Sequence, residues 1–348
     1  MPANLFTPLR ICLALMVACE HMLYLQMDRP TGFFELGQIS LANIAVNAFF
    51  VISGYLITAS AVNRRSVGIF AKARALRILP ALLVNSLIVV FLIAPLFSTL
   101  PPLAYYTSSE TWLFAPKVVS FIDPYPAIAG AQYAHTSFSD LNGPIWTLRY
   151  EVLAYIGTGL LLAFGMASNR RLMIGLLALT GLIFAVSLQG IGNGFLSGSV
   201  GDLLRFSFCY LLGANLYLWR DVFTPKPIMA LAGLAFGATL LLSGLAAGEL
   251  IFDTGLAIGI LALAFAPLSV SQKIRKLPDI SYGLYIWHWP IYMLLINTFP
   301  DAPRWQMLAL VGLPLAICAA MASWFLIEKP TLALKTRKTT ARRKPTYE

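Results

Sequence analysis

The chain has 348 residues, of which 58% are hydrophobic and 11% are charged, and its mean hydropathy is +0.75. This composition excludes a soluble globular domain, because such domains carry about 25% charged residues. The formal net charge of +10 does not indicate nucleic acid, because the basic residues are spaced as membrane topology signals. We therefore predict an all-α, polytopic membrane helical bundle with no nucleic-acid partner.

Ten apolar segments alternate with short breaks rich in Pro, Gly and Arg. The predicted spans lie near residues 5–26, 43–61, 78–98, 146–166, 172–189, 202–219, 228–246, 250–267, 281–297 and 305–327. Basic residues collect in alternate connections and in the C-terminal tail, and by the positive-inside rule these parts face the cytoplasm. Ten transmembrane helices with both termini cytoplasmic are thus predicted.

The domain organisation follows from the same pattern. Residues 1–330 are predicted to form one transmembrane domain, with its first span retained because no small-residue cleavage site follows it. Residues 331–348 form a basic tail, predicted to be disordered or lipid-facing. The four cysteines lie in apolar runs without CxxC spacing, so neither a disulfide framework nor a metal site is predicted. The oligomeric state is left open.

The first span contains two ionisable residues, Arg10 and His21. An ionisable side chain in hydrocarbon is costly, so it usually faces a protein interior or a wet cavity. Eleven positions on a helix return to nearly the same face, about 16 Å further along the axis. The pattern predicts a permanent cation near the cytoplasm and a titratable base deeper in the membrane.

Two further stretches each allow two interpretations. Ser53 and Gly54 in the second span either permit close helix packing or bring a hydroxyl and the backbone near a ligand. Arg74 and Arg77 lie three residues apart before the third span, and therefore on one side of a helix. Guanidinium groups suit phosphate oxygens, but basic residues at a cytoplasmic helix end also serve as topology signals.

The predicted outer side holds the longest connection, residues 99–145, which is rich in Pro and Tyr. It either recognises a sugar or rests on lipid headgroups, and His135 within it is predicted to be a solvated loop residue. Glu151, near the outer end of the fourth span, is either an orienting carboxylate or a snorkelling residue. Structural roles are predicted for the charges near the outer ends of later spans: Asp202, Arg205, Glu249 and Asp253.

The last two spans carry the remaining candidates. Tyr282, His288 and Trp289 crowd the first half of the ninth span, where an aromatic belt at the membrane interface is one interpretation and substrate binding is the other. Glu328 ends the tenth span at the cytoplasmic side, within reach of the basic surface.

Taken together, six motifs resemble the acyltransferase-3 family of integral membrane O-acyltransferases. In order they are Arg10 with His21, FFVISGYLIT, ARALRILP, WTLRYEV, ISYGLYIWHWP and EKP. Each motif is weak alone, but six in this order are specific, and they extend over essentially the whole chain. The resemblance implies ten transmembrane helices and transfer of an acyl group, commonly acetyl, from cytoplasmic acyl-CoA to a hydroxyl. The acceptor would be a carbohydrate, a glycolipid or a glycosylated metabolite.

The resemblance also implies roles for single residues. His21 matches the essential histidine of the family and is the predicted catalytic residue, with Glu151 at an acidic position as the second. Contact with acyl-CoA, a co-substrate and not a tightly bound cofactor, is expected from Arg10, Ser53, Gly54, Arg74, Arg77 and Glu328. Glu20 and Arg149 depart from the family pattern and are expected to tune the acceptor site.

The rival hypothesis is a transporter or flippase in which the intramembrane His, Arg and Glu residues form a proton or substrate path. The sequence has no paired broken helices and no inverted repeat, so it favours the enzyme.

Overall fold

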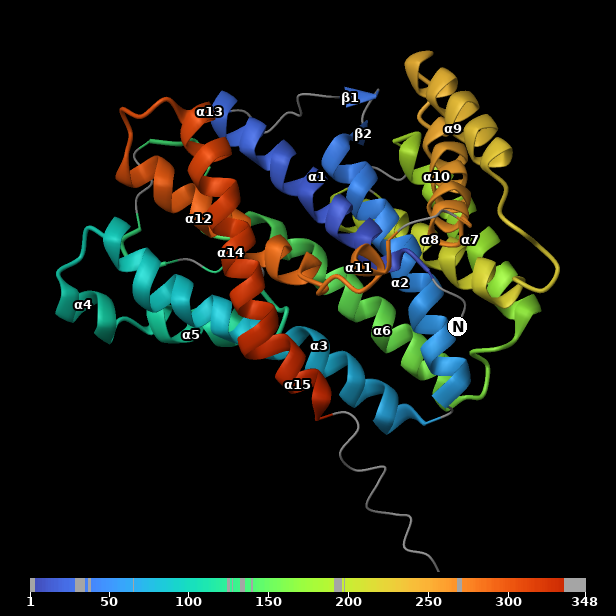
Figure 1. Cartoon of the computed structure of the whole chain (residues 1–348), viewed down its shortest axis with the longest axis horizontal. Helices are drawn as coiled ribbons and strands as arrows, with labels where there is room; N and C mark the ends of the chain where they lie inside the picture. Colours follow the sequence, from blue (N-terminus) through green and yellow to red (C-terminus); the bar gives the residue numbers. More distant parts are fainter. Residues whose placement is uncertain are drawn as a thin grey trace, which may run out of the picture. The chain divides into compact units, whose positions relative to one another are not determined.

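The structure is a computed structural model that describes residues 4–28, 35–36, 39–64, 66–123, 126, 128–131, 135–138, 140–190, 196, 198–267 and 271–334. Within these ranges the chain is mostly helical (Figure 1). Helical segments long and apolar enough to cross a membrane are Phe6–Met27, Leu41–Asn63, Val67–Phe97, Arg170–Leu188 and Arg304–Ala333. An all-α membrane protein agrees with these segments. The count of ten spans and the cytoplasmic location of both termini stay predictions, and the tail from residue 335 onward lies outside the described residues.

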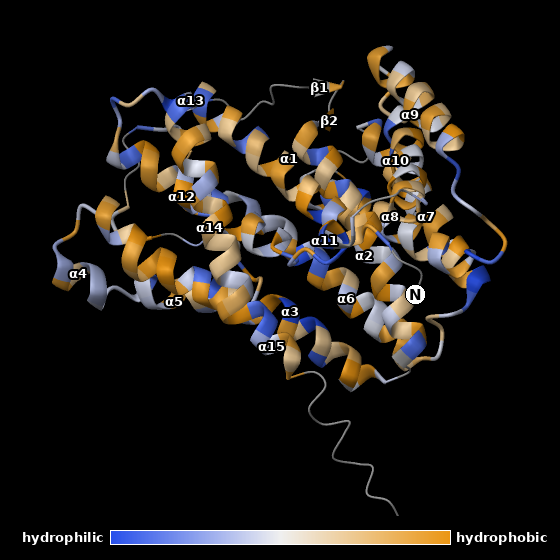
Figure 2. Cartoon of the chain, viewed as in Figure 1, coloured by the Kyte–Doolittle hydropathy of each residue, from blue (hydrophilic) through white to orange (hydrophobic). Residues whose placement is uncertain are grey.

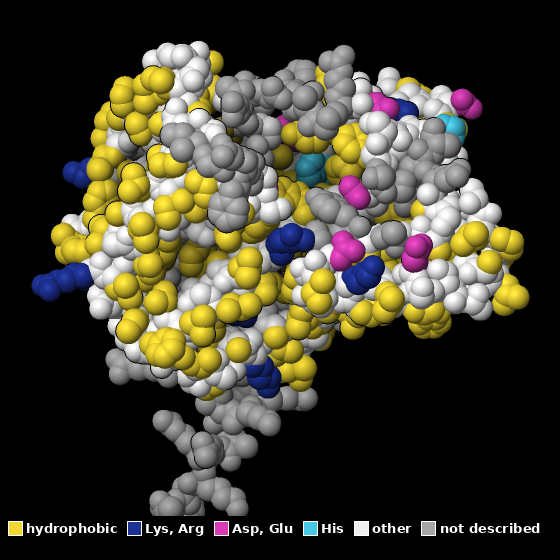
Figure 3. Space-filling model, turned by 180° about the vertical axis from the view of Figure 1, so that it is seen from behind, with side chains coloured by type: hydrophobic (Ala, Val, Ile, Leu, Met, Phe, Trp, Pro, Cys, Tyr) yellow, Lys and Arg dark blue, Asp and Glu magenta, His cyan; other side chains and the backbone are white. Residues whose placement is uncertain are grey.

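The surface has the apolar character that a bilayer requires. Hydrophobic residues predominate along helices such as Pro227–Leu242, labelled α9 (Figure 2), and hydrophobic side chains cover much of the face seen in Figure 3, with few Lys and Arg. Leu182, Leu242, Leu310 and Leu326 are 64–76% exposed. Large apolar side chains exposed in such numbers are unfavourable in water but not in lipid.

The chain divides into two compact units, of which unit 1 comprises Met1–Tyr24, Pro30–Val67 and Tyr150–Asp279. It contains most of α1 (Phe6–Met27), α2 (Leu41–Arg64), most of α6 (Leu148–Ala163), α7 (Arg170–Leu188), α8 (Gly198–Leu218), α9, α10 (Gly248–Ala264) and α11 (Gln272–Arg275). Strands β1 (Glu35–Leu36) and β2 (Ile39–Ser40) pair antiparallel, with Glu35 opposite Ser40. Helix α2 packs on α8 and α10, α7 packs on α8, and α9 packs on α10.

Unit 2 comprises Leu25–Arg29, Gly68–Arg149 and Ile280–Glu348. Its elements are α3 (Val67–Ile88), η1 (Val89–Ile93), η2 (Ala94–Phe97), α4 (Pro102–Thr107), α5 (Ser109–Val119), η3 (Gly143–Thr147), α12 (Ser281–Thr298), α13 (Arg304–Met307), η4 (Leu308–Gly312), α14 (Leu313–Ser323), η5 (Trp324–Glu328) and α15 (Lys329–Ala333). The segments from α13 to α15 follow one another without a break. η5 is a π-helical turn, a widened form common at functional sites, and it contains Glu328.

Each predicted span coincides with a helical stretch. The structure differs from the prediction at the start of the third span and within the connection 99–145. The third helix begins at Val67 and not near residue 78, so Arg74 and Arg77 lie inside α3. The connection 99–145 contains the short helices α4 and α5. Ser108 separates them, and its Oγ accepts a hydrogen bond from the backbone N of Glu110 at 3.2 Å. A serine in this position caps a helix start, which explains why α5 forms there.

Candidate active site

Arg10 forms an ion pair within unit 1. Its Nη1 donates a hydrogen bond to Oδ2 of Asp279 at 2.5 Å, and the two side chains are 23% and 16% exposed. The structure thus gives Arg10 a carboxylate partner, while its predicted contact with acyl-CoA stays a prediction. Asp279 lies 269 residues further along the chain, and no spacing in the sequence indicated it.

His21 is half-buried on α1, and its ring centroid lies 5.5 Å from that of Tyr24. The preceding residue, Glu20, is 1% exposed. Its Oε1 accepts a hydrogen bond from the Tyr24 hydroxyl at 2.9 Å, and its Oε2 accepts one from the backbone N of Ala42 at 2.5 Å. Ala42 lies in the first turn of α2, where the backbone N–H groups lack helical partners and a negative charge is favourable. Glu20 therefore fastens α1 to the start of α2 and fixes the backbone that carries His21.

Glu151 lies on α6 and is held by two hydroxyl groups. Its Oε1 accepts hydrogen bonds from Ser53 Oγ on α2 at 3.4 Å and from the Tyr155 hydroxyl. The carboxylate is thus directed to a neighbouring helix of unit 1, as an orienting group would be, and not to the membrane surface as a snorkelling residue would be.

Gly54 marks the crossing of α2 and α8. A Cβ atom on Gly54 would lie 1.9 Å from the carbonyl oxygen of Tyr210, and one on Gly213 would lie 2.0 Å from that of Val51. Both helices therefore need a glycine to approach this closely. The backbone of α8 fills the space beside Gly54, which favours the interpretation as close helix packing, and contact of Gly54 with acyl-CoA stays a prediction.

In unit 2, Arg77 on α3 forms an ion pair with Glu328. Its Nη1 lies 3.3 Å from Oε2 of Glu328, with the side chains 12% and 1% exposed. The other carboxylate oxygen, Oε1, accepts a hydrogen bond from Ser323 Oγ at 3.0 Å. The guanidinium carbon lies 5.8 Å from the ring centroid of Tyr282 and 5.9 Å from that of Trp324, so aromatic faces also stabilise the cation. The charge of Arg77 is therefore balanced within the protein.

Arg74 precedes Arg77 by one turn of α3 and is half-buried. Lys72 is exposed, with Nζ 3.4 Å from the carbonyl oxygen of Leu334. Binding of phosphate by the arginines stays a prediction, as does acyl-CoA contact by Glu328, which serves as the counter-ion of Arg77.

The candidate substrate-binding residues of the ninth span are buried in α12. The Tyr282 hydroxyl donates to the carbonyl oxygen of Ile78 at 3.0 Å, and Trp289 Nε1 donates to that of Asp140 at 2.7 Å. His288 is completely buried, with Nδ1 2.9 Å from the carbonyl oxygen of Leu284. These contacts fix α12 and the segment before α6. Substrate binding by the three residues stays a prediction.

One buried polar cluster was not indicated by the sequence. Asp253 on α10 is completely buried. Its Oδ1 and Oδ2 accept hydrogen bonds from Asn47 Nδ2 at 3.0 and 3.2 Å, and Oδ2 accepts one from Cys209 Sγ at 3.4 Å. The predicted structural role fits this cluster, and Asp253 lies near the start of α10 as expected, but its burial among α2, α8 and α10 was not predicted.

Each unit contains some of the candidate residues. Arg10, His21, Ser53 and Glu151 belong to unit 1, while Arg74, Arg77 and Glu328 belong to unit 2, as do the candidates of α12. In the described part of the chain, no group of three or more His, Cys, Asp or Glu side chains is arranged to hold a metal ion. The four cysteines are free thiols.

Comparison with known proteins adds three findings. A family model described as an acyltransferase domain, of the type designated acyltransferase 3, matches residues 8–328. An O-acetyl transferase of Shigella phage Sf6 is 26% identical over 341 residues, which cover 97% of this chain and 98% of that protein. Nodulation protein 10 of Rhizobium leguminosarum bv. viciae is 28% identical over 360 residues, which cover 96% of this chain and 94% of that protein. No solved structure matches the chain.

Proposed function

The chain belongs to the acyltransferase-3 family, and from this premise we propose that it transfers an acyl group, acetyl in the simplest case, from cytoplasmic acyl-CoA to a hydroxyl group. The proposed acceptor is a carbohydrate, a glycolipid or a glycosylated metabolite in or near a bacterial inner membrane. Membership of the family and similarity to a protein named O-acetyl transferase support an O-acyltransferase. The donor and the acceptor class belong to the proposal.

The observation that carries the proposal is the placement of His21. A half-buried imidazole next to the anchored Glu20 sits on a backbone that cannot shift without breaking the contact with α2. Imidazole has an unperturbed pKa of about 6.5, so a neutral fraction exists at pH 7 and can accept a proton. A histidine held in this way suits chemistry on a hydroxyl group.

The reaction is balanced with His21 alone as the proton carrier. The acceptor oxygen attacks the thioester carbonyl, the carbon–sulfur bond breaks and an ester bond forms. His21 takes the proton of the hydroxyl and returns it to the departing thiolate, which leaves as the CoA thiol. In the alternative route His21 attacks the thioester first, and the acceptor then takes the acyl group from an acyl-imidazole.

The other candidate residues receive supporting roles in the proposal. Glu151, held by Ser53 and Tyr155, orients a partner at the reacting groups. Arg74 and Arg77 bind phosphate oxygens of the donor, and Glu328 positions Arg77 through their ion pair. Arg10 contributes a cation whose resting partner is Asp279.

The test uses the purified full-length protein in detergent. It is incubated with acetyl-CoA and a panel of sugar and glycolipid acceptors, and release of the CoA thiol is followed with a thiol reagent. We expect release that depends on both the protein and one class of acceptor. Uptake of an acceptor into vesicles without thiol release would favour the transporter and overturn the proposal.

A further inference from the structure

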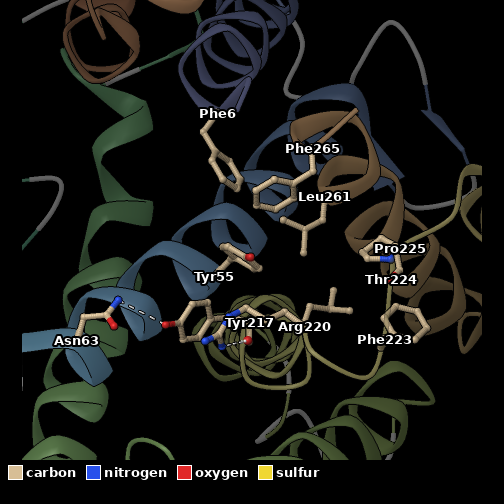
Figure 4. Close-up of a pocket in the computed structure, with 11 residues that line it drawn as sticks. Phe6, Tyr55, Asn63, Tyr217, Arg220, Phe223, Thr224, Pro225, Leu261 and Phe265 are labelled. Atoms are coloured by element: carbon tan, nitrogen blue, oxygen red, sulfur yellow. Dashed lines mark hydrogen bonds between the residues drawn. The ribbon is translucent and has the colours of Figure 1, made fainter. Parts of the chain in front are cut away.

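Unit 1 contains a cavity of about 480 Å³ whose lining includes none of the residues given a role in the proposed acyl transfer. Helices α1, α2, α8 and α10 and the segment after α8 contribute to its wall, and Figure 4 shows the side chains directed into it. Ligand-binding cavities typically have volumes of about 300 to 1,000 Å³, and this volume lies in that range. We call it the aromatic pocket, after Phe6, Tyr55, Tyr217, Phe223 and Phe265, which line it.

Several of these rings meet edge to face and not face to face. Tyr55 and Tyr217 have ring centroids 5.3 Å apart at 88°, and Phe6 and Phe265 have centroids 5.4 Å apart at 89°. In such a T-shaped pair, the ring that presents its edge does not use its own faces in that contact, although the Tyr217 ring also lies under the guanidinium of Arg220. A flat heteroaromatic ligand gains more from these rings than an aliphatic chain does, because every base has a π-face that stacks on aromatic side chains.

Among the described residues that line the pocket, Arg220 is the charged one. Its guanidinium carbon lies 4.0 Å from the ring centroid of Tyr217, and its Nη1 donates to the carbonyl oxygen of the same residue at 2.6 Å. The neighbouring carboxylate of Asp221 pairs with Arg170 and interacts with Arg220 only through its charge. A guanidinium fixed by a ring and a carbonyl, without a direct carboxylate contact in the described part of the chain, suits an anion such as phosphate.

The neutral polar groups of the wall fit the same ligand. Asn63 Nδ2 lies 3.5 Å from the Tyr217 hydroxyl, and Thr224 adds a second hydroxyl. Amide and hydroxyl groups both donate and accept hydrogen bonds, as recognition of base edges or ribose hydroxyls requires.

The location of the pocket is informative as well. Phe6 begins the first helix, Asn63 ends the second, Arg220 follows α8 and Phe265 follows α10. The charge pattern of the sequence predicts that all four of these positions face the cytoplasm, and the structure brings them together at one pocket. The pocket therefore lies on the predicted side of the soluble nucleotides.

We propose that the aromatic pocket binds a nucleotide, with the purine ring among the aromatic side chains and a phosphate at Arg220. The nucleotide end of acyl-CoA and a free adenine nucleotide share this chemistry. Binding of acyl-CoA in the pocket rests on the proposed function, whereas binding of a free adenine nucleotide does not.

The binding experiment uses the purified full-length protein and adenosine 3′,5′-bisphosphate as the probe, measured by titration calorimetry. We expect saturable binding that Arg220→Ala weakens about tenfold or more, because it removes a charge-assisted contact. Arg171→Ala is the control, since Arg171 is an exposed arginine of α7 that does not line the pocket. Absence of saturable binding, or equal affinity in Arg220→Ala and the unchanged protein, would overturn the proposal.

A kinetic experiment distinguishes the nucleotide end of acyl-CoA from a free adenine nucleotide as the occupant of the pocket. Acetyl-pantetheine carries the thioester without the nucleotide. If the donor occupies the pocket, Arg220→Ala raises the KM for acetyl-CoA about tenfold and leaves that for acetyl-pantetheine unchanged. If a free nucleotide occupies the pocket, Arg220→Ala changes neither KM but still weakens binding of the bisphosphate. The binding experiment needs no turnover, so failure of the proposed acyl transfer is distinguishable from failure of the pocket.

Discussion

Arg77 and Glu328 form an ion pair whose carboxylate is 1% exposed, with Nη1 and Oε2 3.3 Å apart. The pair joins α3 to the last helical stretch of unit 2 and brings together residues that are 251 positions apart in the chain. The arginine proposed to meet phosphate is thus held by a carboxylate from the other end of the family domain.

Glu328→Ala is expected to destabilise the protein strongly, because it leaves the largely buried cation of Arg77 without its counter-ion. Removing one partner of a buried pair costs about 3–5 kcal/mol, and we expect a clear fall in the melting temperature in detergent. Lys329→Ala, which removes a neighbouring charge lying over Phe325, is the control and is expected to change little. Equal melting temperatures for the two variants would contradict a structural role of the pair.

Gly54→Ala is expected to separate α2 from α8. The added Cβ would lie 1.9 Å from the carbonyl oxygen of Tyr210, so the helices must move apart, and overpacking of this kind costs about 1–3 kcal/mol. Gly175→Ala in α7 is the matched control, because nothing lies within 4 Å of a Cβ there. Thermal unfolding measured for both variants tests the contact, and a stable Gly54→Ala protein would argue against it.

Glu20→Ala removes the carboxylate that satisfies the backbone N of Ala42 and the Tyr24 hydroxyl. Loss of such a helix cap costs about 0.5–2 kcal/mol, and we expect a lower melting temperature together with reduced thiol release, because α1 carries His21. Tyr24→Phe removes only the hydroxyl contact and should have the smaller effect on both. A larger loss of melting temperature and thiol release in Tyr24→Phe than in Glu20→Ala would show that the contact with α2 does not matter.

Asp28, directly after α1, gives a pH-dependent prediction. Partial burial alone would raise the pKa of Asp28, but hydrogen bonds from Ser137 and Thr136 and the charge of Arg304 outweigh it, so the pKa lies below its usual value. The deprotonated form is therefore favoured by folding. The contribution of Asp28 to the free energy of unfolding is fully present above its unfolded pKa of about 3.9. It is lost as the pH falls through the pKa of Asp28 in the folded protein.

Asp28→Asn should accordingly lower the melting temperature at pH 7, and the gap to the unchanged protein should narrow as the pH falls below 4. Asp301→Asn, which alters an exposed aspartate, serves as the control and should show no such dependence. A difference in melting temperature between Asp28→Asn and the unchanged protein that stays constant with pH would contradict the lowered pKa of Asp28.

The sequence predicted the helical segments well, because each is a long apolar run between charged or Pro- and Gly-rich breaks. It did not predict the partners of the charged residues. Asp279 pairs with Arg10 across 269 positions, and hydropathy and spacing carry no information about contacts at such a distance.

Packing favours one of the alternatives that the local pattern left open at Gly54. Gly54 has the same appearance in the sequence whether its open side faces a ligand or a helix, and in the structure the α8 backbone at Tyr210 lies against it. Asp253 lies near the start of α10, as its place in the apolar run indicated, but the sequence did not indicate its contacts with Asn47 and Cys209. The family motifs contain Arg77 and Glu328 but do not indicate that the two form an ion pair.

In the proposed reaction His21 carries the proton or the acyl group, and its replacement tests this role. Thiol release from acetyl-CoA and ester formation on the acceptor are measured together for the unchanged protein, His21→Ala and His135→Ala, each verified as folded by thermal unfolding. His135 is an exposed histidine whose backbone oxygen, and not its ring, accepts the hydrogen bond from Arg304. We predict one thiol per ester for the unchanged protein and for His135→Ala, and a loss of at least about a hundredfold for His21→Ala. Full transfer by folded His21→Ala would show that His21 carries neither the proton nor the acyl group.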